Sequence, residues 1–128
     1  MAETPTIGYY PVLIPLEKKR GDSLTVAWWH EETDLTGAIL QVRFYDPSAP
    51  NVPIISLSSN GVSPRVIVAV TPVNGAIPAR TRVEFTLNPL ETEALGMGKI
   101  GDVQIEMGGV LDTQIAFETK FKERGKRA

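Results

Sequence analysis

The chain has 128 residues and a mass of 14.0 kDa, which is the size of one domain with one hydrophobic core. Its net charge of −2 gives no global field that would favour nucleic acid or an acidic membrane surface. The absence of cysteine excludes a disulfide scaffold and a thiolate zinc site.

Residues 1–21 are rich in proline and apolar side chains. Pro5, Pro11 and Pro15 exclude a central strand, because proline cannot donate to a sheet ladder. Two interpretations stay open: a kinked strand at a sheet edge, and an extended arm that lies on a neighbouring subunit. The side chains that such an arm would present are Tyr9, Tyr10, Val12, Leu13 and Ile14.

Residues 22–121 consist mainly of short runs of alternating polarity, each ended by a turn. We expect strands at Ser23–Trp29, Ala38–Tyr45, Pro53–Leu57, Arg65–Val70, Thr81–Leu87, Asp102–Met107 and Thr113–Phe121. This spacing predicts an all-β sandwich domain over residues 22–121, preceded by the arm or edge strand and followed by a basic tail at 122–128.

Two of these runs carry signals of contact with a partner. Trp28 and Trp29 are consecutive, so one is expected in the core and the other, Trp29, on the surface. The run Val66–Val70 is apolar on both of its faces. Such a strand is either buried on two sides or covered on one side by another chain.

One helix is expected, between two of the strands. Asn88 is a favourable N-cap, Pro89 suits the first helical position, Glu91 suits the first turn and Gly96 ends the segment. About two turns fit a short crossover between the sheets.

Residue patterns typical of catalysis are weak. His30 is the only histidine, and position 34 is Asp where a zincin helix would need a second histidine. We therefore expect His30 to be a solvated turn residue. The aspartates Asp22, Asp34, Asp102 and Asp112 stand at strand ends or turns, where aspartate forms local hydrogen bonds. We expect neither enzymatic activity nor a cofactor or metal.

Two charged segments have ordinary explanations. Arg20-Gly21-Asp22 matches a tripeptide that some integrins bind, but here it enters a strand and is expected to form a turn. The basic tail could contact nucleic acid or an acidic neighbour, and we expect it to serve solubility or contact between subunits. Its basic residues are Lys122, Arg124, Lys126 and Arg127.

The order of motifs resembles small β-sandwich proteins of tailed bacteriophages, in particular the N-terminal domains of baseplate upper proteins. The matching segments cover residues 21–121 and read GDSLTVAWW, DLTGAILQVRF, IISLSSNGV, VEFTLNPLETEALGMG and GDVQIEMGG. The resemblance implies an immunoglobulin-like sandwich of about seven to eight antiparallel strands with one short crossover helix.

The resemblance also implies a non-enzymatic structural role in a virion. In that role, the chain docks in many copies on itself and on other virion proteins, with neither nucleic acid nor membrane as a partner. The contact residues that we expect are those of the arm, Trp29 and the basic tail. The alternative is a carbohydrate- or receptor-binding sandwich, with exposed aromatic candidates Trp29, Tyr45 and Tyr10.

Overall fold

The structure, a computed structural model, describes residues 12–122, except for the side chains of Val12, Leu13, Asp112 and Gln114. The described part of the chain contains eight strands and one helix. They are β1 (Val12–Lys19), β2 (Leu24–His30), β3 (Ile39–Tyr45), β4 (Pro53–Ser58), β5 (Val66–Thr71), β6 (Arg80–Leu87), α1 (Pro89–Leu95), β7 (Met97–Met107) and β8 (Val110–Lys122). Within residues 12–122, no helix is long and apolar enough to cross a membrane.

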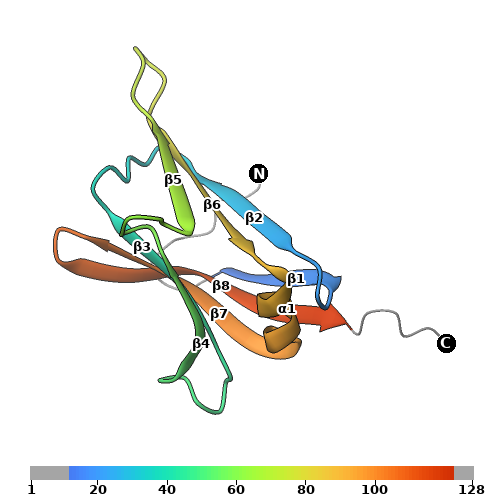
Figure 1. Ribbon diagram of the computed structural model, residues 1–128. Helices are drawn as coiled ribbons and strands as arrows, with labels where there is room; N and C mark the ends of the chain where they lie inside the picture. Colours follow the sequence, from blue (N-terminus) through green and yellow to red (C-terminus); the bar gives the residue numbers. More distant parts are fainter. Residues whose placement is uncertain (1–11, 123–128) are drawn as a thin grey trace.

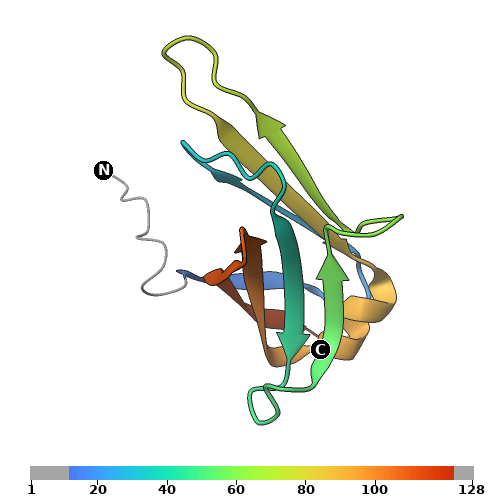
Figure 2. The ribbon, with the colours of Figure 1, turned by 90° about the vertical axis from the view of Figure 1, so that its left-hand side faces the viewer.

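The strands form two sheets that face each other as a sandwich (Figure 1). One sheet has five strands in the order β1-β8-β7-β3-β4, and the other has three in the order β2-β6-β5. All neighbouring strands are antiparallel except β1 and β8, which are parallel. Figure 2 shows that the β5–β6 connection projects well beyond the sandwich. The predicted all-β sandwich is confirmed.

All seven predicted strands are present, but the last two are longer than predicted. β7 begins at Met97 rather than Asp102, and β8 begins at Val110 rather than Thr113. Met107 and Val110 face each other across a turn of only two residues. Gly108 and Gly109 have φ values of 62° and 84°, which glycine adopts without strain and which a tight hairpin turn requires.

The core lies between the sheets and is dominated by aromatic side chains. Phe44, Phe85 and Phe117 are at most 1% exposed, and their ring centroids lie 5.7–6.2 Å apart. Trp28 joins them from β2, with its ring 6.0 Å from Phe85 and 5.9 Å from Phe117. Aromatic pairs at these separations add to the stability given by burial alone.

The predicted crossover helix is confirmed, and its cap has the expected chemistry. The Asn88 side chain accepts from the Glu91 amide at 2.9 Å, and Glu91 accepts from the Asn88 amide at 2.8 Å. This reciprocal capping box fixes the start of α1, and Gly96 caps its end. The helix thereby carries the chain from β6 in one sheet to β7 in the other.

The first described strand, β1, is an edge strand of the larger sheet and contains Pro15. Leu16 is only 5% exposed, and Ile14 packs against the core. The sandwich therefore begins at Val12, ten residues earlier than the boundary predicted at residue 22. Ile14, one of the residues predicted for the arm, lies in this edge strand and packs against the core of its own chain.

Candidate protein-binding surface

A β-sandwich has open edges, and native edge strands usually carry features that prevent pairing with another chain. β1 carries Pro15 and ends in Lys18–Lys19. β4 begins at Pro53, and its pairing with β3 shifts register at Phe44/Tyr45. These features disfavour the pairing of a further strand with β1 or β4.

β5 lacks those features. Its segment Val66–Val70 contains neither charge nor proline, and its pairing with β6 runs without a register shift. β5 is the last strand of its sheet, and within residues 12–122 no other strand pairs with its open side. Alternate backbone N–H and C=O groups of β5 are therefore free to pair with an incoming strand.

The side chains of β5 divide between the sandwich interior and the surface. Val66 is 1% exposed, and Val68 and Val70 are partly buried. Ile67 on the opposite face is 51% exposed, and Ala69 is exposed beside it. Of the two predicted alternatives for this strand, burial on both sides is wrong.

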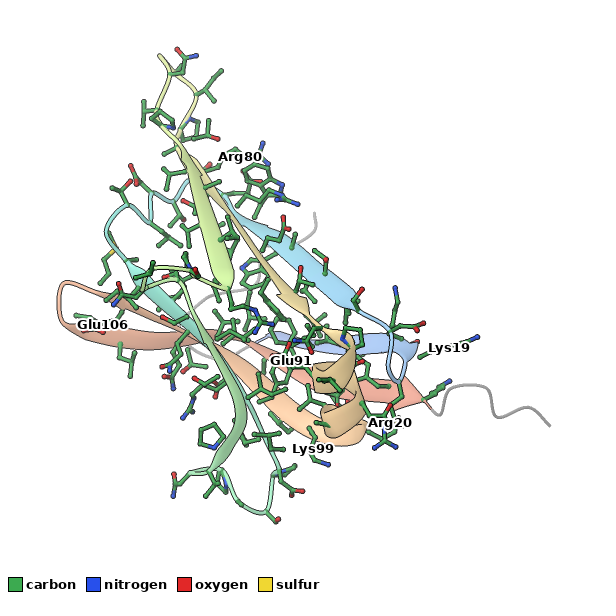
Figure 3. The ribbon with its side chains drawn as sticks, viewed as in Figure 1. Lys19, Arg20, Arg80, Glu91, Lys99 and Glu106 are labelled. Atoms are coloured by element: carbon green, nitrogen blue, oxygen red, sulfur yellow. The ribbon has the colours of Figure 1, made fainter. Side chains whose placement is uncertain are left out.

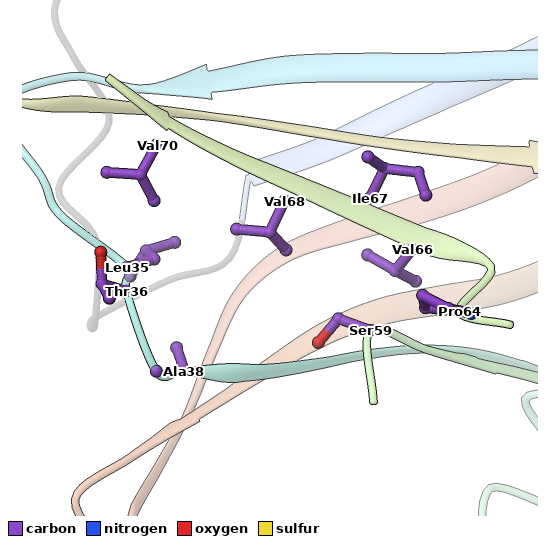
Figure 4. A pocket seen from close by; sticks show the side chains of 10 residues that line it. Leu35, Thr36, Ala38, Ser59, Pro64, Val66, Ile67, Val68 and Val70 are labelled. Atoms are coloured by element: carbon purple, nitrogen blue, oxygen red, sulfur yellow. The ribbon is translucent and has the colours of Figure 1, made fainter. Parts of the chain in front are cut away.

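A groove of about 410 Å³ runs along the inner side of β5 (Figure 4). The β5 residues Val66, Ile67, Val68 and Val70 form one wall, and Ser59 and Pro64 also line the groove. The opposite wall comes from the β2–β3 loop and its exit, at Leu35, Thr36, Gly37 and Ala38. The groove is thus an apolar trough bordered by a free strand edge. We call this combination the β5 groove.

The wall formed by the β2–β3 loop is held in place by a buried threonine. The hydroxyl of Thr81, which is fully buried, donates to the Thr33 carbonyl at 2.8 Å and accepts from the Leu35 amide at 3.1 Å. Leu35 itself is 6% exposed and belongs to the core. The loop wall is therefore preorganised rather than formed on binding.

The predicted outward tryptophan is confirmed. Trp29 is 42% exposed, whereas Trp28 packs in the core. The guanidinium carbon of Arg80 lies 3.6 Å from the centroid of the Trp29 ring, and Arg80 also pairs with Glu31 at 2.8 Å (Figure 3). One face of the indole is thus covered by a cation.

The aromatic candidates for sugar binding are not brought together. Trp29 lies on the three-stranded sheet, whereas Tyr45 lies on the five-stranded sheet. Tyr45 instead lies beside Arg43, whose guanidinium carbon is 5.8 Å from its ring centroid. Tyr10, the third candidate, lies outside the described residues.

A polar group on the five-stranded sheet is the second candidate site. Arg43 and Asp102 are register partners on β3 and β7, with 3.4 Å between Nη2 and Oδ2. Burial and the charge of Asp102 raise the pKa of Tyr45, against the opposing effect of Arg43. The other carboxylate oxygen of Asp102 and Nε of Arg43 are buried without a hydrogen-bond partner. Because they are buried, a partner at the surface does not reach them.

A third candidate is the tip of the β7–β8 hairpin, which Glu106 marks in Figure 3. Its large apolar side chains are unusually exposed. Together with a neighbour on β3 they are Ile39 (39%), Met107 (43%), Val110 (67%) and Leu111 (61%). Ile39 faces Glu106 across the β3–β7 pair, so these side chains lie at one end of the larger sheet.

The prediction for His30 is wrong. His30 is 8% exposed and closes β2, with Nε2 accepting from the Trp28 indole at 2.8 Å. The β strand extends one residue further than predicted, which turns His30 away from solvent. Burial lowers the pKa of His30. Within the described residues, no group of three or more His, Asp or Glu side chains could hold a metal ion.

The Arg20-Gly21-Asp22 segment forms the predicted turn between β1 and β2. Nε of Arg20 donates to the Glu93 carbonyl at 3.0 Å, and the Gly21 amide donates to the Thr92 hydroxyl at 3.0 Å. That hydroxyl donates in turn to the Asp22 carbonyl at 2.9 Å. The segment is therefore tied to α1.

The remaining predicted contact residues lie at the chain ends. Val12 and Leu13 belong to β1, and Lys122 is exposed at the end of β8. Tyr9, Tyr10, Arg124, Lys126 and Arg127 lie outside the described residues. The β5 groove was not among the predicted contacts. The signal for it was the run Val66–Val70, apolar on both faces.

The strand order defines the class of the fold. β2-β6-β5 corresponds to strands B-E-D of immunoglobulin domains, and β8-β7-β3-β4 corresponds to G-F-C-C′. The protein is therefore an immunoglobulin-like β-sandwich. No protein-family model matches the sequence, and no curated protein matches it.

Solved structures that resemble the chain have low sequence identity to it. One is the inferred receptor-binding domain of the human endogenous retrovirus envelope EnvP(b)1, with 9% identity, a TM-score of 0.45, and coverage of 91% of this chain and 98% of that one. Another is the extracellular fragment of novel immune-type receptor 11 from Ictalurus punctatus, including its stalk region. It has 12% identity, a TM-score of 0.42, and coverage of 93% and 92%.

Proposed function

We propose that this chain is a non-enzymatic docking module that binds an extended, apolar segment of a protein along the β5 groove. The observation that carries the proposal is the free edge of β5, where Val66–Val70 is uncharged and lies beside an apolar trough of about 410 Å³. An extended segment added there gains backbone hydrogen bonds from the edge and burial of alternate side chains in the trough.

The proposed setting follows from the resemblance to tailed-phage structural proteins. In that setting the module docks in many copies within a virion, on copies of itself and on other structural proteins. Pairing of strand edges suits such a role, because it needs only a short segment and can be repeated from copy to copy. The register of the strands fixes which residues meet. A nucleic-acid or membrane partner is not part of the proposal.

Sedimentation velocity over a concentration series tests the docking function on the full chain. We expect the native protein to associate as concentration rises. Val68→Lys should shift the association midpoint at least tenfold upward, because it places a charge at the trough and edge. Ser56→Lys on the β4 edge is the matched control and should leave the midpoint unchanged.

A second variant separates docking from folding. Ile67→Lys changes a side chain that is 51% exposed, so the domain tolerates it even if Val68→Lys does not fold. Circular dichroism confirms the fold of each variant. Equal association by native, Val68→Lys and Ile67→Lys proteins would rule out docking at β5.

A receptor-binding module is the second candidate function, supported by the exposed apolar side chains at the β7–β8 hairpin. This hairpin corresponds to the F–G connection, whose loop contributes to binding in variable immunoglobulin domains. Val110→Ser and Leu111→Ser change residues that are 67% and 61% exposed. Loss of host-cell binding in these variants, with no loss in Val68→Lys, would favour the receptor-binding function.

A further inference from the structure

We propose that the segment that docks in the β5 groove is Thr6–Tyr10 of a second copy of this chain. The inference rests on the proposed docking function and identifies its partner. It joins a segment just before β1 to a groove on the opposite side of the sandwich.

The two segments are similar in length. Pro5 and Pro11 enclose the five residues Thr6–Tyr10, each of which has a backbone N–H. Proline has none, so strand pairing of this segment ends at its two prolines. β5 is six residues long, from Val66 to Thr71, is uncharged throughout and is followed by Pro72, so it can accommodate all five residues of the segment.

The side chains of Thr6–Tyr10 suit the groove. Ile7 and Tyr9 are two residues apart, so in an extended segment they lie on the same face. They can enter the trough formed by Val68 and Val70, whose side chains are partly buried on the groove side of β5. Gly8 between them has no side chain to obstruct the approach of the two backbones.

Neither segment contains a charge that would oppose pairing. Thr6–Tyr10 and Val66–Val70 are both uncharged. Arg65, which directly precedes β5, forms an ion pair with Glu91 at 2.6 Å and donates a hydrogen bond to the Thr86 carbonyl at 2.9 Å. The edge therefore offers no repulsion to a strand from another copy.

We assign the full segment to a second copy, because Tyr10 cannot reach β5 of its own chain. Val12 pairs with Ile115 of β8, and β3, below the groove, is three strands away from β1. Three strand spacings amount to about 14 Å. Only Pro11 lies between Tyr10 and Val12, and two residue steps reach at most ~7 Å. Tyr10 therefore cannot pair with β5 of its own chain.

Contacts of this kind are heterologous, since one copy gives its N-terminal segment and receives another at its groove. Repetition builds a ring if the rotation closes and a filament if it does not. Either outcome satisfies the many-copy docking of the proposed function.

Site-specific cross-linking tests the inference, and the absence of native cysteine makes every cross-link unambiguous. One copy carries Tyr10→Cys and the other carries Ile67→Cys, and a short bis-maleimide is added to their mixture. We expect a mixed dimer in at least tenfold higher yield than with a partner carrying Ser48→Cys. Ser48 is an exposed residue of the β3–β4 loop and is the matched control.

Gly8→Pro provides the second readout, because it removes an amide from the middle of the donor segment and changes no residue of β1–β8. Sedimentation should show the same loss of association as Val68→Lys. Mixed-dimer yield equal to that of the Ser48→Cys control, or unchanged association of Gly8→Pro, would overturn the inference. A chain carrying both Tyr10→Cys and Ile67→Cys that cross-links as a monomer would also overturn it.

The two proposals fail in different ways. If Val68→Lys abolishes association and Gly8→Pro does not, docking at β5 stands and the occupant is another segment, such as β5 of a second copy. If neither variant affects association, or if no association occurs, both proposals are wrong.

Discussion

The indole N–H of Trp28 donates to Nε2 of His30 across 2.8 Å, between residues two positions apart on one face of β2. The neutral imidazole therefore carries its own hydrogen on Nδ1, because Nε2 accepts. Trp28 in turn packs on Phe85 and Phe117. The protonation state of one buried histidine is thereby coupled to the aromatic core.

This coupling predicts acid sensitivity. Burial lowers the pKa of His30, so the unfolded chain takes up its proton first as pH falls. The free energy of unfolding should be constant above the ordinary histidine pKa of about 6.5 and should decline below it, levelling off below the lowered folded value. Chemical denaturation followed by tryptophan fluorescence over about pH 5–8 measures the effect.

His30→Gln is the control for this titration. It should cost about 1 kcal/mol at neutral pH, because the hydrogen bond to Trp28 is weakened, and should remove the decline below about pH 6.5. A decline of the same size in the variant would assign the acid sensitivity to other groups.

A glycine in β7 leaves room for a core side chain of the neighbouring strand β3. A Cβ at Gly101 would lie 2.5 Å from Cε1 of Phe44, a fully buried side chain. Gly101→Ala should therefore lower the free energy of unfolding by about 1–3 kcal/mol through overpacking. Thermal and chemical denaturation measure this loss.

A double-mutant cycle shows whether the contact with Phe44 is the cause. Gly101→Ala combined with Phe44→Leu should destabilise by less than the sum of the single changes, because the smaller side chain makes room. Additive losses would mean that the glycine is needed for another reason.

The loop wall of the β5 groove depends on Thr81. Thr81→Val removes the hydroxyl that bonds Thr33 and Leu35, so it should cost about 1–3 kcal/mol and weaken docking as the wall loosens. Thr25→Val is the control, because the exposed Thr25–Thr86 hydroxyl pair should contribute within about 0.5 kcal/mol. If both changes weakened docking equally, the β2–β3 loop held by Thr81 would have no specific role in docking.

Local features of the sequence predict most of this fold. Alternation places the strands, and Asn88, Glu91 and Gly96 place the helix, because strand faces and helix caps depend on near neighbours. The outward position of Trp29 follows from the same alternation. The Val66–Val70 run likewise indicates an unusual strand, because both of its faces are apolar.

Other features depend on contacts between distant residues. The parallel pairing of β1 with β8 joins segments about a hundred positions apart, and no local pattern encodes it. His30 sits where a turn is expected, yet one added strand residue buries it against Trp28. The β5 groove is formed by β5, the β2–β3 loop and Ser59, which are distant in the sequence. The sequence therefore indicates the unusual strand β5 but not the groove beside it.

Hydrogen exchange along β5, measured as a function of protein concentration, tests the central claim most directly. The amides of Val66–Thr71 that face away from β6 should exchange rapidly in dilute protein and become at least tenfold slower as the protein associates. Val68→Lys should remove that dependence. Exchange along β5 that is the same at every concentration, while the protein associates, would contradict docking at this edge.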